Sequence, residues 1–345
     1  MLSSRAFQLA QLAAIKHARR ALRDLGLEND TWIDPFAAVE RAGALLFFAP
    51  LRGLCGAYMP RLPKGDAAGV LVSITYPLSV QRFTAAHELG HLWMGHSPSV
   101  DKEEDILPRG LVDQTSGLAT TEEEVKAEAF AAHFLMPMRR VSERIDSLGL
   151  SRSDLNVPDT VYDLSLWFGV SYAAMAWHLA TLKQIDRPAV QRLLETKPRE
   201  IKKEALGRDV VIDWHNDVWS LSARHSGEVV HARVGDALTI TLPSHATGGY
   251  VWDVEAIDSQ SLEVLRMEPV TGAAQPRDEA LIVGSSRPHR AILKVKALGE
   301  HPISLFERRP WEPFNDSTKF RLTIVAEPVP ERGLFPKQRQ ALIRA

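Results

Sequence analysis

The sequence predicts an α+β protein, in which a mixed domain rich in helices is followed by an all-β sandwich. Three observations predict this class. The chain of 345 residues is long enough for two domains. Residues 1–185 contain apolar residues at helical spacing and one β-branched run. Residues 209–327 contain short β-type runs separated by turns rich in Gly, Pro, Ser and Asp, which is typical of a sandwich.

The expected domain limits follow from where this pattern changes. We expect one domain over residues 1–185, a charged helix and linker over 186–222, a β-sandwich over 223–330 and a tail over 331–345. The chain begins with apolar residues at helical spacing that are broken by Gln, Lys and Arg, and it lacks the apolar core of a signal peptide. An amphipathic packing helix is therefore expected at the start.

The helix predicted around residues 82–96 carries the run HELGH, in which His87 and His91 are four positions apart. Positions i and i+4 lie on one face of a helix, so both imidazoles can bind one metal ion. Glu88 lies next to these ligands and can reach a water on the metal. Two histidines, a carboxylate base and an open coordination position form the zinc-peptidase arrangement. The alternative is an ordinary amphipathic helix with two surface histidines.

A second predicted helix, residues 121–137, offers the third ligand. Glu124 and Glu128 are i,i+4 neighbours on one of its faces. One carboxylate would complete a His, His, Glu ligand set, and the other could hydrogen-bond a ligand histidine. Glu122 and Glu123 are expected only to favour the helix dipole.

A third histidine ligand has less support than a carboxylate. His96 lies five positions after His91, which is about 140° around a helix. It therefore points elsewhere unless the helix ends at Gly95.

Composition favours a protein of a reducing compartment. Lys and Arg number 41 against 43 for Asp and Glu, so the formal net charge of -2 gives no basic field for nucleic acid. The single cysteine, Cys55, forbids an internal disulfide. We therefore expect a cytoplasmic protein that makes no direct contact with nucleic acid.

Residues 164–182 carry no formal charge and approach the length of a membrane-spanning helix. Gly169 interrupts the segment, and Ser171 is a suitable helix N-cap. We therefore expect a helical hairpin packed in a core, and no contact with a membrane. A DNA-binding helix-turn-helix is the alternative, but only Lys183 near its end could meet phosphates.

These motifs resemble the ImmA/IrrE-type metallopeptidases over about residues 10–185. The matching segments are RFT at 82–84, HELGH at 87–91, and a later helix that ends in FAAHFLMP at 130–137. The resemblance implies a zincin-like domain that hydrolyses intracellular proteins, often helix-turn-helix transcriptional repressors. It implies Zn²⁺ held by His87, His91 and Glu124, with Glu88 as the base. Glu128 stands where the family usually has Asn or Asp, so the choice between Glu124 and Glu128 stays open, and the register of the motif favours Glu124.

The run at residues 69–76 (GVLVSITY) is rich in β-branched residues and predicts a strand. In zinc peptidases of this type, such a strand can edge the cleft and pair with an extended substrate.

The C-terminal half resembles the chagasin-type inhibitors of papain-like cysteine proteases, which are immunoglobulin-like sandwiches that present three loops at one end. The first loop matches at Thr247, Gly248, Gly249 and Tyr250, and the third matches at Arg309, Pro310, Trp311 and Glu312. Gly248 replaces the threonine that enters the protease cleft in the family, and the middle loop, residues 284–286, matches poorly. We expect Trp311 to anchor a partner protein; the alternative is that it packs between the sheets.

The sequence therefore predicts a Zn²⁺-dependent endopeptidase with a C-terminal protein-recognition module. Its expected partners are a protein substrate, with a transcriptional repressor as the candidate, and a cysteine protease or another protein at the sandwich loops. The alternative is a catalytically silent metal-binding protein that acts as a cysteine protease inhibitor or binding module. The intact Glu88 argues for the peptidase, because a structural metal site needs no base beside its ligands.

Overall fold

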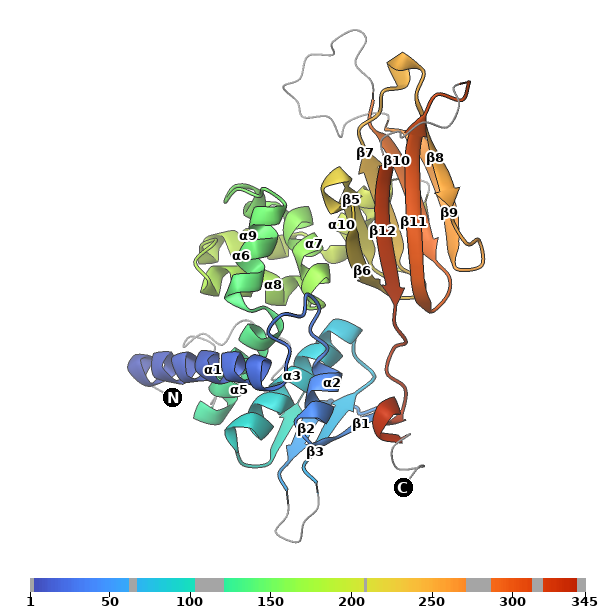
Figure 1. The fold of residues 1–345 in the computed structure, drawn as a ribbon. Coiled ribbons are helices and arrows are strands. Elements are labelled where there is room, and N and C mark those ends of the chain that lie inside the picture. Colours follow the sequence, from blue (N-terminus) through green and yellow to red (C-terminus); the bar gives the residue numbers. More distant parts are fainter. Residues whose placement is uncertain are drawn as a thin grey trace. The chain divides into compact units, whose positions relative to one another are not determined.

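The computed structural model describes residues 3–61, 67–102, 121–207, 210–270, 287–311 and 319–339 (Figure 1). The chain forms two compact units, one of residues 1–196 with 330–345 and the other of residues 197–329. Among the described helices, none combines the length and apolar character that a membrane span requires. The division expected at residues 185, 222 and 330 stays a prediction.

The first unit contains a five-stranded mixed sheet in the order β13-β1-β3-β2-β4. Its strands are β1 (Leu45–Ala49), β2 (Leu54–Met59), β3 (Gly69–Ser73), β4 (Ser99–Lys102) and β13 (Gly333–Leu334). The prediction that the strand at 69–76 edges the cleft is wrong, because β3 is paired on both sides, by β1 and β2. Val70 and Val72 of β3 are buried, as expected for a central strand. In the described part of the sheet, β4 is the edge strand next to β2.

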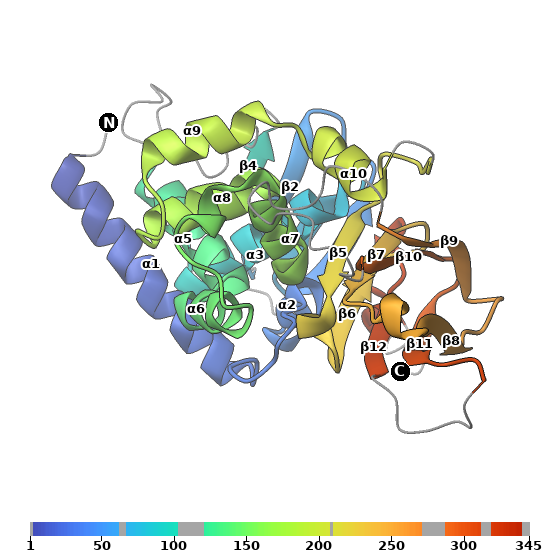
Figure 2. The same ribbon diagram turned by 90° about the horizontal axis from the view of Figure 1, so that it is seen from above.

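Helices α2 and α3 pack on this sheet, and further helices pack beyond them (Figures 1 and 2). The described helices of this unit are α1 (Ser4–Asp24), α2 (Pro35–Arg41), α3 (Leu78–Met94), α5 (Glu122–Leu135), α6 (Met138–Ser147), α7 (Pro158–Phe168), α8 (Tyr172–Thr181) and α9 (Arg187–Glu195). The helix α3 packs on β2 and β3, and α5 packs between α3 and α1. A face of small buried residues lets α1 approach α5 closely: Ala10, Ala14, Ala18 and Ala21.

The contact between α3 and α5 depends on small residues. A Cβ atom at Gly90 would lie 3.1 Å from the Phe130 ring and 3.3 Å from the Cα atom of Ala127. Phe130 and Ala127 are both fully buried. Because Gly90 has no side chain, the two helices come close enough for the histidines of α3 to meet the carboxylates of α5.

The helical hairpin expected over residues 164–182 is confirmed. The helix α7 ends at Gly169, which has a left-handed φ of 61°, and the side chain of Ser171 caps α8 by accepting from Ala174 N. Arg82 joins this turn to α3, because its Nε donates to Gly169 O at 3.0 Å and its guanidinium lies 4.1 Å from the Trp32 ring centroid.

The second unit is a sandwich of two four-stranded sheets, ordered β5-β7-β10-β9 and β6-β12-β11-β8. The strands are β5 (Val218–Ser222), β6 (Glu228–Ala232), β7 (Ala237–Leu242), β8 (Val251–Ala256), β9 (Leu262–Pro269), β10 (His289–Val295), β11 (Gly299–Arg308) and β12 (Lys319–Ala326). Helix α10 (Pro198–Leu206) contributes Leu206 to a cluster with Ile212, Val218 and Ile292. The predicted α+β class is therefore confirmed.

Gly169→Ala should destabilise the first unit by about 2–4 kcal/mol, because an L residue is strained at this φ and its Cβ would lie 2.5 Å from Arg82 Nε and 2.6 Å from the Trp32 ring. Gly26→Ala is the matched control, since Gly26 has a similar φ of 70° but nothing within 4 Å of its Cβ position. It should cost only about 1 kcal/mol. Urea unfolding measures both changes, and equal losses would contradict the packing role of Gly169.

Candidate metal centre and loop platform

The histidines of the HELGH run converge on the buried side of α3. His87 is 2% exposed and His91 is fully buried. Their Nε2 atoms lie 3.0 Å apart. The i,i+4 spacing on a regular helix therefore places both ring nitrogens at one point, as the sequence predicts.

Glu124 meets this point from α5. Its Oε2 lies 3.2 Å from His87 Nε2, and its Oε1 lies 3.5 Å from His91 Nε2. In the described part of the chain, these three residues form the one group of potential metal ligands whose donor atoms all lie within 4.8 Å of one another. Burial favours the protonated form of Glu124, but hydrogen bonds and charge from His87 and His91 outweigh it and hold the pKa of Glu124 below its usual range.

Glu128 lies one helical turn further along α5, on the other side of the His87 ring. Its Oε2 is 3.6 Å from His87 Nδ1, whereas Glu124 faces Nε2. The geometry thus separates the two carboxylates, with Glu124 at the donor cluster and Glu128 behind the imidazole. A carboxylate in that second position orients a ligand histidine.

His96 contacts the ring of His91. The helix α3 ends at Gly95, whose left-handed φ of 66° turns the chain back toward the helix. His96 Nδ1 therefore lies 3.1 Å from His91 Nδ1. Burial, followed by the influence of His91, lowers the pKa of His96 to about 4. His96 is thus a hydrogen-bonding neighbour of the donor cluster and not one of the three converging groups.

The candidate base, Glu88, is fully buried. Ser99 Oγ donates to Glu88 Oε2 at 3.0 Å. A Cβ at residue 56 would lie 2.8 Å from Glu88 Oε1, so Gly56 leaves space for this carboxylate. Burial and the negative charge of Asp101 raise the pKa of Glu88 well above its usual range.

Asp101 is a site residue that the sequence analysis missed. It is 4% exposed, and its Oδ1 lies 3.6 Å from His87 Nε2. Ser99 and Asp101 share one face of β4 and are both buried, whereas Val100 between them is 58% exposed. This inverted alternation, with polar residues inside and an apolar residue outside, is the signal that could have located them.

The donor set fits Zn²⁺. Two imidazoles and one carboxylate, with donor atoms 3.0–3.5 Å apart, have the spacing of ligands that share a single zinc ion. The carboxyl groups of Glu88 and Asp101 are both buried beside these donors, and negative charge on either is costly unless a cation balances it. A divalent ion at the donor cluster would supply that balance.

In the second unit, the predicted loops form one platform. Arg309 Nε donates to Gly248 O at 2.9 Å, and its guanidinium lies 4.6 Å from the Tyr250 ring centroid. Gly249 has a left-handed φ of 81°, and a Cβ there would collide with the Trp311 ring. Trp311 is nevertheless 70% exposed, so it does not pack between the sheets.

A buried carboxylate holds the first loop in place. Glu307 of β11 is 1% exposed; its Oε1 accepts from His245 N at 2.6 Å, and its Oε2 lies 2.8 Å from His245 Nδ1. Thr247 and Gly248 follow in a short 3₁₀ turn, residues 246–248, and Pro310 precedes Trp311 in the third loop. The middle loop at 284–286 and Glu312 lie outside the described residues.

Two families match the chain in separate segments. The model of the IrrE N-terminal-like domain, Peptidase M78, matches residues 58–179, and that of the chagasin family peptidase inhibitor I42 matches residues 231–324. Chagasin of Trypanosoma cruzi is 32% identical over 103 residues, which make up 30% of this chain and 92% of chagasin.

Solved structures similar to the second unit include a cysteine protease inhibitor from Entamoeba histolytica, which is 19% identical with a TM-score of 0.28 and covers 33% of this chain and 98% of that one. The ICP of Leishmania mexicana is 21% identical with a TM-score of 0.22, and the match covers 35% of this chain and 97% of the ICP chain. From the family matches and the chagasin relative, the chain belongs to the chagasin family through its C-terminal unit, which is fused to a domain that matches the IrrE N-terminal-like, Peptidase M78 model.

Proposed function

We propose that the first unit is a Zn²⁺-dependent endopeptidase and that the second unit recognises its protein partner. The observation that carries the proposal is the convergence of His87, His91 and Glu124 beside the buried Glu88. A His, His, Glu set with a neighbouring carboxylate is the donor set of zinc peptidases. The proposed substrate is an intracellular protein, with a transcriptional repressor as the candidate that the family resemblance implies.

In the proposed mechanism, His87, His91 and Glu124 hold the metal. When bound there, zinc would supply Lewis-acid polarisation of the peptide carbonyl and would lower the pKa of a water molecule. Glu88 accepts a proton from the attacking water and passes it to the leaving amine. Burial and the charge of Asp101 raise its pKa, which favours holding the proton between these two steps. Glu128 and His96 keep the two imidazole rings in their orientations.

In the proposed recognition module, the exposed Trp311 is the anchor, and Arg309 keeps the first loop beside it. Gly248 presents no side chain where the chagasin family has its inserted threonine. The platform therefore suits recognition of a partner protein, whereas strong inhibition of a papain-like protease would need the missing side chain. Cys55 is the single cysteine of the chain, so no internal disulfide can form, which supports the proposed cytoplasmic location.

Glu88→Gln should keep the metal and the fold but lower proteolysis by about 10²–10⁴-fold, the usual effect of removing a general base. The test compares zinc content, thermal unfolding and cleavage of a generic peptide with the wild type. Glu195→Gln, at the exposed C-terminal end of α9, is the control and should leave all three unchanged. Cleavage by Glu88→Gln at the wild-type rate would remove the base role.

Glu124→Ala should lose zinc, because its two oxygens face both histidine donors. Glu128→Ala should keep zinc with an affinity reduced about 10–100-fold, which is typical when a partner of a ligand is lost. Metal content after dialysis against a weak chelator distinguishes these results. The opposite ranking would transfer the ligand role to Glu128.

The full chain should inhibit papain weakly or not at all, whereas Gly248→Thr should strengthen inhibition at least about tenfold by restoring the inserted side chain. A Cβ at residue 248 meets only Tyr250 at 3.4 Å and 3.5 Å and Arg309 at 3.9 Å, so this loop accepts the substitution. Trp311→Ala in the Gly248→Thr background should weaken inhibition again, by about thirtyfold, as expected when an anchor is truncated.

The control for this series is Leu298→Ala, which removes another exposed apolar side chain, in the turn before β11. It should leave inhibition unchanged. Nanomolar inhibition of papain by the wild type would instead identify the second unit as a working inhibitor.

A further inference from the structure

A cavity of about 600 Å³ lies in the first unit, away from the donor cluster. It is bounded by α1, the segment that follows α1, the junction of α5 and α6, and the end of α8. The buried side chains of Leu22, Leu27 and Ile33 form an apolar floor, and Ile15 and Leu182 extend it. A pocket of this volume and lining accommodates the body of a small organic molecule.

Positive charge dominates the wall of this cavity. Five cationic side chains line it against one acidic residue, Glu28; the cations are Arg19, Arg23, Arg139, Arg140 and Lys183. Arg23 pairs with Asp24 and Arg139 pairs with Glu143, and neither acid lines the cavity. Within the described residues, no ion pair compensates Arg19 or Lys183. These two side chains are therefore available to an anion.

Lys183 occupies a position that normally favours glycine. It follows α8 with a φ of 60°, and among the described residues it is the one non-glycine residue with positive φ. Lys183 N donates to Ala180 O at 3.0 Å, and Gln184 N donates to Leu179 O at 2.9 Å, the hydrogen bonds of a glycine-type helix end. A lysine at this position costs about 1 kcal/mol of backbone strain, which points to a use for its ammonium group.

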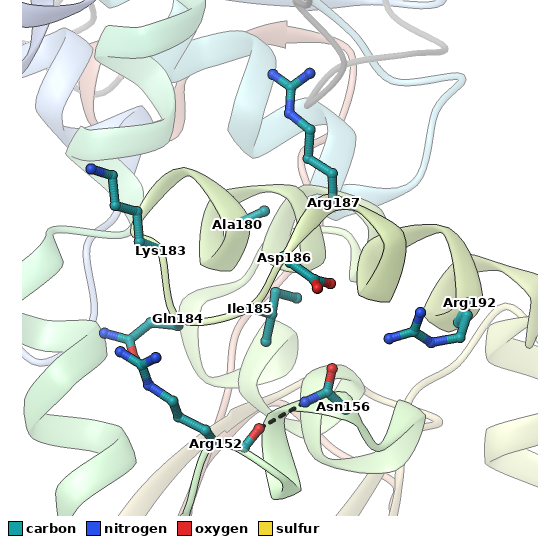
Figure 3. A pocket seen from close by; sticks show the side chains of 9 residues that line it. All are labelled: Arg152, Asn156, Ala180, Lys183, Gln184, Ile185, Asp186, Arg187 and Arg192. Atoms are coloured by element: carbon teal, nitrogen blue, oxygen red, sulfur yellow. Dashed lines mark hydrogen bonds between the residues drawn. The ribbon is translucent and has the colours of Figure 1, made fainter.

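Lys183 also borders a second, more open hollow with Arg152, Asp186 and Arg192. Figure 3 shows that the Lys183 side chain points away from Asp186 and Arg192 of that hollow. Asp186 is already engaged there, because it caps α9 by accepting from Ala189 N at 2.8 Å. The ammonium group of Lys183 therefore belongs with the apolar cavity.

Part of the cavity wall is formed by α5, the helix that carries Glu124. His133 of α5 lines this cavity and also a neighbouring one of about 270 Å³, which Glu128 borders. Burial, with a smaller contribution from Arg19, lowers the pKa of His133 to about 4, so its ring is neutral near pH 7. A neutral ring adds a hydrogen-bonding group to the apolar floor without adding charge.

We propose that this cavity binds an amphipathic organic anion, whose apolar body lies on Leu22, Leu27 and Ile33 and whose acidic head contacts Arg19 and Lys183. The ligand would contact α5, and α5 also carries Glu124 of the candidate metal centre. The binding proposal itself does not depend on peptidase activity.

Calorimetric titration of the full chain with dodecanoate, below its micelle concentration and at low salt, tests the proposal. We expect saturable binding of one dodecanoate per chain, and binding of dodecanol and dodecyltrimethylammonium at least about tenfold weaker, since each lacks a charge-assisted hydrogen bond. Arg19→Ala and Lys183→Gly should each weaken dodecanoate binding about tenfold. Lys183→Gly relieves the strained φ, so unfolding cannot explain its loss of binding.

Arg20→Ala is the matched control, because Arg20 is adjacent on α1, pairs with Asp24 and does not line the cavity. It should change dodecanoate binding by less than about twofold. Absence of saturable binding to the wild type, equal binding of dodecanol, or equal losses in Arg19→Ala and Arg20→Ala would each overturn the proposal.

Discussion

The close contact between α3 and α5 at Gly90 determines the geometry of the first unit. One helix carries both histidines and the other carries both candidate carboxylates, so no donor cluster forms unless their axes approach closely. Gly90 permits that approach, and the stacked rings of Phe130 and Phe134 keep α5 anchored in the core. A larger residue at position 90 would press on Phe130 and move Glu124 away from the histidines.

Burial then determines the chemistry of the cluster. His87, His91, Glu88 and Asp101 are all less than 5% exposed, so each charge is strongly felt by its neighbours. Hydrogen bonds stabilise the charged form of Glu124, whereas burial and Asp101 disfavour the charged form of Glu88. Two glutamates from one small region therefore have opposite pKa shifts, the separation expected of a ligand and a base.

Local patterns predicted the parts of this site that lie on single helices. The i,i+4 spacing gave the shared face of His87 and His91, and the register of the α5 motif favoured Glu124. The sandwich followed from regularly spaced short strands, and the hairpin followed from Gly169 and Ser171. Each of these signals is contained within one element and its ends.

Features that depend on strand pairing were not predicted. Asp101 reaches the cluster because it pairs with Gly56 across β2 and β4, and nothing in its own segment specifies that register. The central position of β3 likewise depends on β1 and β2. Two further features also escaped prediction: the Trp311 ring packs against Gly249 of a loop far away in the sequence, and the strained Lys183 stands where a sequence pattern would place glycine.

The central claim is that two helices hold one divalent ion through His87, His91 and Glu124. Titration of the chelator-treated full chain with Zn²⁺ in a calorimeter tests it most directly. The structure predicts binding of one Zn²⁺ per chain. His91→Ala should lower the Zn²⁺ affinity at least about a hundredfold, since removing a ligand should cost more affinity than removing a residue that hydrogen-bonds a ligand. No uptake by the wild type, or an unchanged affinity in His91→Ala, would contradict the metal centre.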